Sequence, residues 1–250
     1  MRISDPPWQR FCDYLEKEFA FDVTPEALQK FQILLSQLKA YNAVHNLVSA
    51  HSDEELVLRH FADSLASLPL IRRCIQDTAC ADMRLADLGS GGGFPVLPLS
   101  IALPELTFAS VESVAKKCAF QQQITQALNL PVSVINERIE ILGQSKEHRA
   151  RYDMACSRAL SALSPNLEYA MPLLKMGGCA LIYKSEKYPE EIKSAENAAN
   201  MLGAKLCEIF KYNLPLERET KHFAVLVYRK IKATPAQFPR KVGVPQKNPL

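Results

Sequence analysis

The chain contains only nine glycines, yet four of them, Gly89, Gly91, Gly92 and Gly93, lie within five consecutive positions. The short apolar run Arg84–Leu88 precedes the cluster and a helical pattern follows it, so the sequence predicts a strand, a tight turn and a helix. Glycine has no Cβ, so it permits unusual φ values and lets a ligand approach the backbone closely. In open α/β sheets, ligands bind at such turns, at the carboxyl ends of parallel strands. The cluster therefore predicts a binding loop.

The spacing of this loop narrows the class of ligand. It is Gly-x-Gly-x-Gly from Gly89, with Asp87 two residues before it. A dinucleotide fingerprint needs a glycine at the sixth position, where this chain has Phe94. The pattern instead resembles the first motif of S-adenosylmethionine-dependent methyltransferases, whose cofactor has no pyrophosphate. Glu112 ends the next predicted strand, 23 residues after Gly89 (112 − 89), and it could bind a ribose diol in either class. A nicotinamide-dependent oxidoreductase therefore stays an alternative.

Alternating strand and helix patterns provide the elements that position this loop. Such alternation implies right-handed crossovers and a parallel sheet. The strand-like runs are Arg84–Leu88, Thr107–Val111, Val132–Asn136, Tyr152–Ser157 and Cys179–Lys184, with helical patterns at Val114–Leu128 and Ser164–Leu174. Two more runs, Lys205–Tyr212 and His222–Arg229, have no helix between them, which predicts an antiparallel pair at the sheet edge.

The two ends of the chain differ from this core. Residues 1–80 read as a helical N-terminal extension packed on the core, with Ser52 opening one helix and Arg59 and Asp63 spaced to pair. Residues 81–233 form the predicted α/β domain. Residues 234–250 contain four prolines and no apolar periodicity, so we expect an extended arm rather than packed structure.

Composition and charge exclude several classes of protein. Hydrophobic residues make up 48% and charged residues 23% of the chain, which is a globular mix and not a disordered one. No secretory signal or apolar run of about 18 residues is present, so we expect a cytoplasmic protein with no membrane partner. Seven scattered cysteines without a Cys-x-x-Cys pair favour reduced thiols over a zinc site or disulfides.

The net charge of +3 conceals an uneven distribution. Residues 211–250 carry nine basic and two acidic residues, a net charge of +7, so the rest of the chain carries −4. A basic end on a neutral-to-acidic body favours a polyanionic partner that contacts one face. An ordinary solvated tail explains the same charge equally well.

Six sequence elements, in order from about Tyr41 to the C-terminus, resemble those of the small-subunit ribosomal RNA methyltransferase family called glucose-inhibited division protein B, or RsmG. They are Asn46-Leu47 with Glu54–Leu65, Asp87–Pro95, Val111-Glu112-Ser113, Arg138-Ile139-Glu140, Ser157-Arg158-Ala159 and Phe238-Pro239-Arg240-Lys241. Three positions depart from the family pattern: Val96 and Ser185 stand where glycine is usual, and Glu112 stands where Asp is usual. Of these, Val96 could narrow the cofactor entrance.

The resemblance implies a class I methyltransferase fold, a Rossmann-like α/β architecture with a seven-stranded sheet whose last strand is antiparallel. It also implies methyl transfer from S-adenosyl-L-methionine to N7 of one guanine in a loop of 16S rRNA near the decoding site. The partner would be 16S rRNA, the small ribosomal subunit or an assembly intermediate, and we expect a monomer. The expected cofactor contacts are Gly89, Gly91, Gly93, Phe94, Glu112, Ile139, Glu140 and Arg158.

Guanine N7 has a free lone pair and no proton, so this reaction needs no general base. We therefore expect positioning rather than acid–base catalysis, and neither a catalytic residue nor a metal. Cys156 reads as a buried strand cysteine rather than a nucleophile. The candidate RNA contacts are Arg59, His60, Lys184, His222, Arg240 and Lys241. A non-catalytic RNA-binding module that keeps the same fold is the rival from another class.

Overall fold

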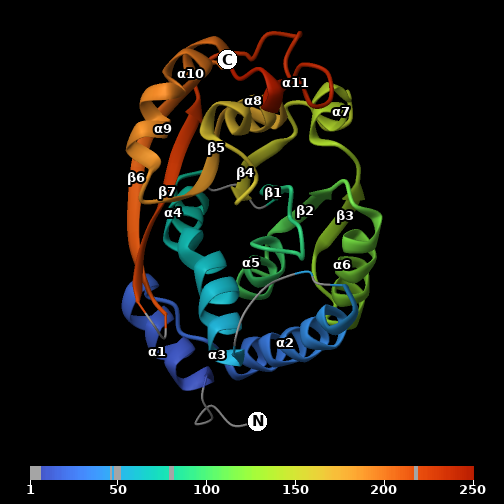
Figure 1. Ribbon diagram of the computed structural model, residues 1–250, viewed down its shortest axis with the longest axis vertical. Helices are drawn as coiled ribbons and strands as arrows, with labels where there is room; N and C mark the ends of the chain where they lie inside the picture. The colour runs from blue at the N-terminus through green and yellow to red at the C-terminus, as the bar shows by residue number, and fades with distance from the viewer. Residues whose placement is uncertain (1–6, 46, 48–51, 79–81, 217–218) are drawn as a thin grey trace.

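The computed structural model describes residues 7–45, 47, 52–78, 82–216 and 219–250 (Figure 1). One seven-stranded sheet runs through the molecule in the order β3-β2-β1-β4-β5-β7-β6. Its strands are β1 (Arg84–Leu88), β2 (Thr107–Glu112), β3 (Val132–Asn136), β4 (Tyr152–Arg158), β5 (Leu174–Ser185), β6 (Ala204–Pro215) and β7 (Thr220–Lys230). Strands β1 to β5 pair in parallel and β7 pairs antiparallel with both of its neighbours. The predicted seven-stranded sheet with an antiparallel last strand is confirmed.

Helices cover both faces of this sheet. Those before β1 are α1 (Trp8–Phe19), α2 (Pro25–His45), α3 (Asp53–Leu56), the π-helix η1 (Val57–Ala62), the 3₁₀-helix η2 (Leu65–Ser67) and α4 (Leu68–Thr78). The later ones are α5 (Val96–Ala102), α6 (Ala115–Ala127), α7 (Ile139–Gln144), α8 (Leu163–Leu173), α9 (Tyr188–Ser194), α10 (Glu196–Leu202) and α11 (Val244–Lys247). One apolar core joins α1, α2, η1, α5 and α6 to the sheet, and a second joins α7, α8 and α10 to its other side.

The strand order places the turns that matter for binding. It reverses between β1 and β4, so the connections after these two strands leave in opposite directions and open a crevice at their carboxyl ends. The glycine cluster follows β1, Glu112 ends β2, and Arg158 ends β4. The predicted binding loop therefore lies at the topological switch point of the sheet.

A chain of aromatic rings connects the N-terminal helices to the glycine loop. Phe94 stacks on Phe61 with ring centroids 5.8 Å apart. Phe61 in turn contacts Phe31 at 6.0 Å and Trp8 at 6.4 Å. Phe11, Phe31, Phe61 and Trp8 have no solvent exposure, so these rings form the interior of the N-terminal helices and also the support of Phe94.

The expectation of an unpacked arm over residues 234–250 is wrong. Phe238 is only 3% exposed and belongs to the second apolar core. The guanidinium of Arg149 donates hydrogen bonds to the carbonyls of Thr234, Pro235 and Phe238, which replace the regular backbone pairing that the prolines prevent. Polar contacts hold most of this stretch in place. It therefore packs against the core although its sequence has no apolar periodicity.

The expected pair of Arg59 and Asp63 is also wrong. Arg59 bonds to Glu55 at 3.0 Å, whereas Asp63 bonds to Arg158 at 2.8 Å. Both residues lie at the π-helix η1, where the wider turn changes which side chains share a face. The hydroxyl of Ser52 accepts a hydrogen bond from Glu55 N, which confirms the predicted N-cap.

Among the described residues, none of the helices is both long enough and apolar enough to cross a membrane. Six of the seven cysteines are described, and none of these six is in a disulfide; Cys80 lies outside the described residues.

Candidate functional site

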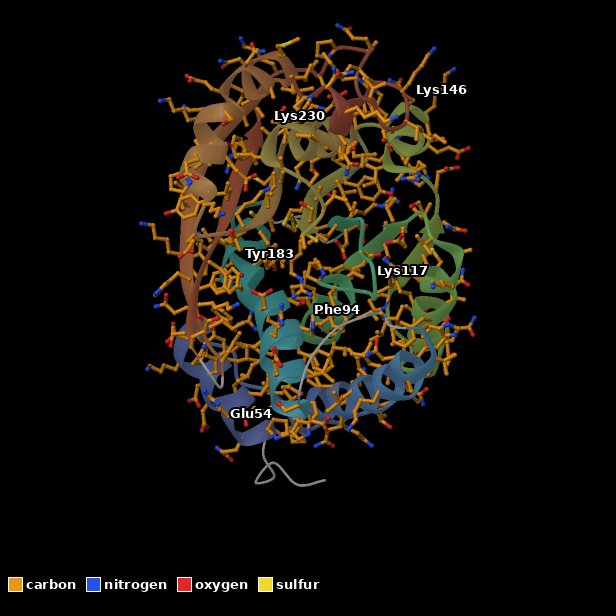
Figure 2. All side chains as sticks on the ribbon, in the orientation of Figure 1. Glu54, Phe94, Lys117, Lys146, Tyr183 and Lys230 are labelled. Carbon is orange, nitrogen blue, oxygen red and sulfur yellow. The ribbon has the colours of Figure 1, made fainter. Side chains whose placement is uncertain are left out.

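A cavity of about 490 Å³ opens at the carboxyl ends of β1, β2 and β4, where Phe94 and Lys117 mark its position in Figure 2. Seven of the eight residues expected to contact a cofactor line it: Gly89, Gly91, Phe94, Glu112, Ile139, Glu140 and Arg158. These residues come from four separate loops, and the fold brings them together. Gly93 is the exception, because it does not line the cavity.

The structural reason for glycine differs among the three loop positions Gly89, Gly91 and Gly93. Gly89, Gly91 and Gly93 have φ of +70°, +58° and +91°, in the region that side chains disfavour. A Cβ at Gly89 would clash with Leu160, and one at Gly93 would clash with Leu97. A Cβ at Gly91 would meet no atom closer than 4.0 Å. Gly93 thus serves packing against α5, while Gly91 keeps open space beside the backbone.

Glu112 is fixed at the rim of this space by backbone amides. Its Oε2 accepts a hydrogen bond from Gly91 N at 2.9 Å, and its Oε1 accepts one from Val114 N at 2.8 Å. Each carboxylate oxygen has two lone pairs, so both can still accept another hydrogen bond. Glu112 is one methylene longer than the Asp usual in the family, and its carboxylate still bonds to the loop. The two backbone amides hold this carboxylate at the cavity in a fixed orientation.

Asp87 lies beneath the loop with no solvent exposure. Its Oδ2 accepts a hydrogen bond from Val96 N at 3.1 Å, but its Oδ1 has no partner among the described residues. Burial raises the pKa of this carboxyl to about 7, although the hydrogen bond from Val96 N and the charge of Arg158 oppose the change. A cation bound above the loop would stabilise its ionised form.

Val96 does not narrow the cavity. Its side chain is buried in the first turn of α5 and does not line the cavity. Cys156 is buried beside Asp87, and burial raises the pKa of its thiol well above the usual value. The interpretation of Cys156 as a buried, unreactive strand cysteine is consistent with this position.

Arg158 is held by a network at the carboxyl end of β4. Its Nη1 donates to Asp63 Oδ2 at 2.8 Å and to the carbonyl of Arg59 at 3.2 Å. Its Nη2 lies 3.1 Å from Nδ1 of His60, and its guanidinium lies over the ring of Phe94 at 5.5 Å. Because arginine only donates, Nδ1 of His60 must accept, which makes this histidine neutral with its proton on Nε2. The hydroxyl of Tyr212 donates to Asp63 Oδ1 at 2.6 Å and completes the network.

Several lining residues were not expected from the sequence, among them Leu47, Lys117, Tyr169, Gly243 and Gln246. The last two belong to the C-terminal stretch, where Gly243 N donates to Glu140 Oε1 at 2.9 Å. The Phe-Pro-Arg-Lys element just before them was a signal for this region. The sequence predicts an RNA contact for this element, whereas the structure places the residues just after it in the wall of the first cavity.

The six expected RNA contacts separate into two groups. Arg59, His60, Lys184 and His222 line a second cavity of about 690 Å³, together with Ser185. Neither Arg240 nor Lys241 lines either cavity.

Arg240 has a structural partner instead. Its guanidinium bonds to Glu168, which has no solvent exposure, at distances of 2.6 to 3.1 Å. Its backbone N donates to the same carboxylate. The pairing explains why the C-terminal stretch stays on α8, and it leaves Lys241 as the exposed cation of the element.

Comparison with known proteins agrees with the motifs. A family model described as GidB, rRNA small subunit methyltransferase G, matches residues 27–220. The ribosomal RNA small subunit methyltransferase G of Carboxydothermus hydrogenoformans is 36% identical over 234 residues, which cover 93% of this chain and 96% of that protein. The protein of the same name from Desulfitobacterium hafniense is 37% identical and is covered to 92%, as is this chain.

A solved structure supports the fold. The 16S rRNA (adenine(1408)-N(1))-methyltransferase from Catenulisporales acidiphilia has a TM-score of 0.50 at 13% identity, covering 65% of this chain and 94% of that one. At this identity the likeness concerns the fold alone. On the family match and the identities above, the chain belongs to the rRNA small subunit methyltransferase G family.

Proposed function

We propose that this protein transfers a methyl group from S-adenosyl-L-methionine to N7 of a guanine in a loop of 16S rRNA near the decoding site. Family membership supports methyl transfer to ribosomal RNA. The observation that carries the cofactor assignment is the pairing of Gly91 and Glu112, which gives an open cradle with a fixed carboxylate at its rim.

The residues of the first cavity fit this cofactor. Glu112 can accept hydrogen bonds from both hydroxyls of the ribose, because two backbone amides hold its carboxylate in one orientation. Asp87 is buried beneath the loop, and its ionised form would favour the positive charge of the cofactor's sulfonium and ammonium. Gly91 keeps free the space that any side chain would fill. Ile139 and Glu140 line the wall after β3.

The cofactor, when bound, supplies an electrophilic methyl group on sulfur. Held beside Gly91 and Glu112, it would supply this methyl to the N7 lone pair, and the electron pair of the carbon–sulfur bond would stay on sulfur. No proton moves, so the protein needs no general base, and the buried thiol of Cys156 has no part in the reaction. The contribution of the chain is to hold methyl and N7 in line and to exclude water.

We also propose that the protein acts as a monomer. We place the protein in the cytoplasm with 16S rRNA, in the small subunit or in an assembly intermediate, as its polyanionic partner. Of the expected RNA contacts, Lys241, Arg59 and His222 have exposed side chains, which supports their proposed role.

The experiment has two parts. Calorimetry should show binding of S-adenosylmethionine and none of NADH; the reverse result would support the nicotinamide-dependent alternative. Reaction with free 16S rRNA and with small subunits, followed by cleavage at N7-methylguanine, should then reveal a single modified guanine. Cofactor binding without methylation of any ribosomal RNA preparation would instead identify a non-catalytic RNA-binding module. Gly91→Val is the matched negative control in both parts.

A further inference from the structure

The second cavity lies directly beside the first. The two share Arg158, His60 and Ala159 as a common wall. The second cavity is bounded by η1, by the carboxyl end of β5 and by the hairpin of β6 and β7, and its volume of about 690 Å³ is ample for a small-molecule ligand. A group bound there would meet the methyl donor across the shared wall.

The hydrogen-bond partners of Arg158 show on which side its guanidinium lies. Asp63 and Arg59, which both accept from Nη1, line the second cavity and not the first. The hydrogen bonds of Arg158 to described residues use Nη1 and Nη2, and no described residue accepts a hydrogen bond from Nε. The side chain keeps 15% exposure. A rigidly held donor therefore remains at the boundary between the two cavities.

We propose that the second cavity receives the target guanosine, swung out of the RNA, and that Nε–H of Arg158 donates a hydrogen bond to O6 of its guanine. This inference rests on the proposed function. In guanine, O6 and N7 lie side by side on one edge of the base. A donor on O6 would therefore turn N7 towards the shared wall without occupying its lone pair. Arg158 is thereby a positioning residue for the acceptor base, and not only a cofactor contact.

The same contact discriminates between the two purines. Adenine carries an amino group in place of O6, and this group is a donor. Arginine has donors and no acceptor, so it cannot bond to that amino group. An adenine in the cavity would leave the buried donor of Arg158 unpaired, which costs more than the loss of an ordinary hydrogen bond.

The rest of the lining suits a nucleotide. Arg59 and Lys221, which pair with Glu55 and Glu219, also line the cavity and supply positive charge for the RNA backbone. The carboxylates Glu186 and Glu219 also line the cavity, and a carboxylate can accept from N1–H and the 2-amino group of guanine. Enzymes that act on a base commonly extrude it into such a pocket, which is easiest in a loop.

The test replaces the target guanine in small subunits reconstituted with synthetic 16S rRNA. Inosine keeps O6 and N7, whereas 2-aminopurine keeps N7 and loses O6. We expect wild-type kcat/KM to fall about 10- to 100-fold with 2-aminopurine, the effect of one charge-assisted hydrogen bond. Inosine should react faster than 2-aminopurine. Equal rates with guanine, inosine and 2-aminopurine would overturn the inference before any variant is tested. A wild-type enzyme that does not methylate the guanine substrate would refute the proposed function itself.

Arg158→Lys then identifies the side chain, since lysine keeps the charge but has no Nε–H. We expect this variant to react at similar rates with guanine and 2-aminopurine. A change in cofactor affinity does not alter this ratio, because the same cofactor serves both reactions. Arg151→Lys, at the opposite end of β4 and outside both cavities, is the matched control and should keep the wild-type ratio. An R158K enzyme that keeps the wild-type ratio, with or without weaker cofactor binding, would contradict the assignment.

Discussion

The buried carboxyl of Asp87 should make the affinity for S-adenosylmethionine depend on pH. Burial raises its pKa to about 7, and its Oδ1 has no partner among the described residues. The methionine part of the cofactor is cationic, so it binds best when Asp87 is ionised. With this pKa, roughly 3% of Asp87 is ionised near pH 5.5 and roughly 24% near pH 6.5. We therefore expect the dissociation constant to fall about eightfold over this interval.

Isothermal titration calorimetry across this interval measures the change. The interval lies below the range of about 7.7–8.0 in which the cofactor's own α-amino group titrates. Asp87→Asn has no titrating carboxyl at this position and is the matched control, so any pH dependence that it retains comes from other groups. A wild-type dissociation constant that changes by the same factor as that of D87N would refute a role for the ionised carboxyl.

The same pKa shift bears on stability, with the opposite sign. The folded-state pKa of Asp87 lies above its ordinary 3.8, so the fold favours the neutral carboxyl. The resulting stabilisation is present below about pH 4 and is lost as the pH rises through about 7. Asp87→Asn imitates the neutral form, so at about pH 8 we expect it to melt at a higher temperature than wild type while it binds cofactor more weakly. A lower melting temperature for D87N would count against the burial argument.

Three further changes test the loop and the C-terminal stretch. Gly91→Val should abolish cofactor binding in calorimetry and cost about 1–2 kcal/mol of stability through its positive φ; undiminished affinity would exclude the glycine loop as the binding site. Arg240→Ala leaves the buried Glu168 without its partner, so we expect about 3 kcal/mol less stability and a melting temperature ~6–12 °C lower; an unchanged melting curve would show that the pair contributes nothing. Lys241→Glu should weaken RNA binding and reduce the slope of log affinity against log salt by about one or more, and a constant slope would place Lys241 outside the interface. We prefer this replacement to removal of residues 234–250, because removal would also take Phe238 out of the core.

Much of the fold could be predicted because turns and apolar runs are local signals. The ranges Arg84–Leu88 and Val132–Asn136 agree with the observed β1 and β3. The sequence does not predict the first half of β5, since residues such as Lys175, Gly177 and Gly178 are not typical of a strand. Pairing of Tyr152 with Leu174 extends the strand in spite of this composition, and such pairing is invisible in a single sequence.

The first cavity could be predicted further than the second. Gly91 and Glu112 belong to one strand–turn–helix unit and the strand that follows it, so their spacing carries the signal. The network of Arg158, Asp63 and Tyr212 joins residues that lie far apart along the chain. No local pattern links them, and the π-helix that aligns Asp63 with Arg158 has no sequence signature of its own.

The aromatic chain also determines where the functional unit begins. Phe94 borders the methyl-donor cavity, and it rests on Phe61, which Phe31 and Trp8 hold from the other side. A shortened protein starting at β1 would keep the entire glycine loop and lose the surface beneath Phe94. The shortest part of this chain that keeps the glycine loop in its binding conformation therefore begins at α1. The loop itself begins some eighty residues later.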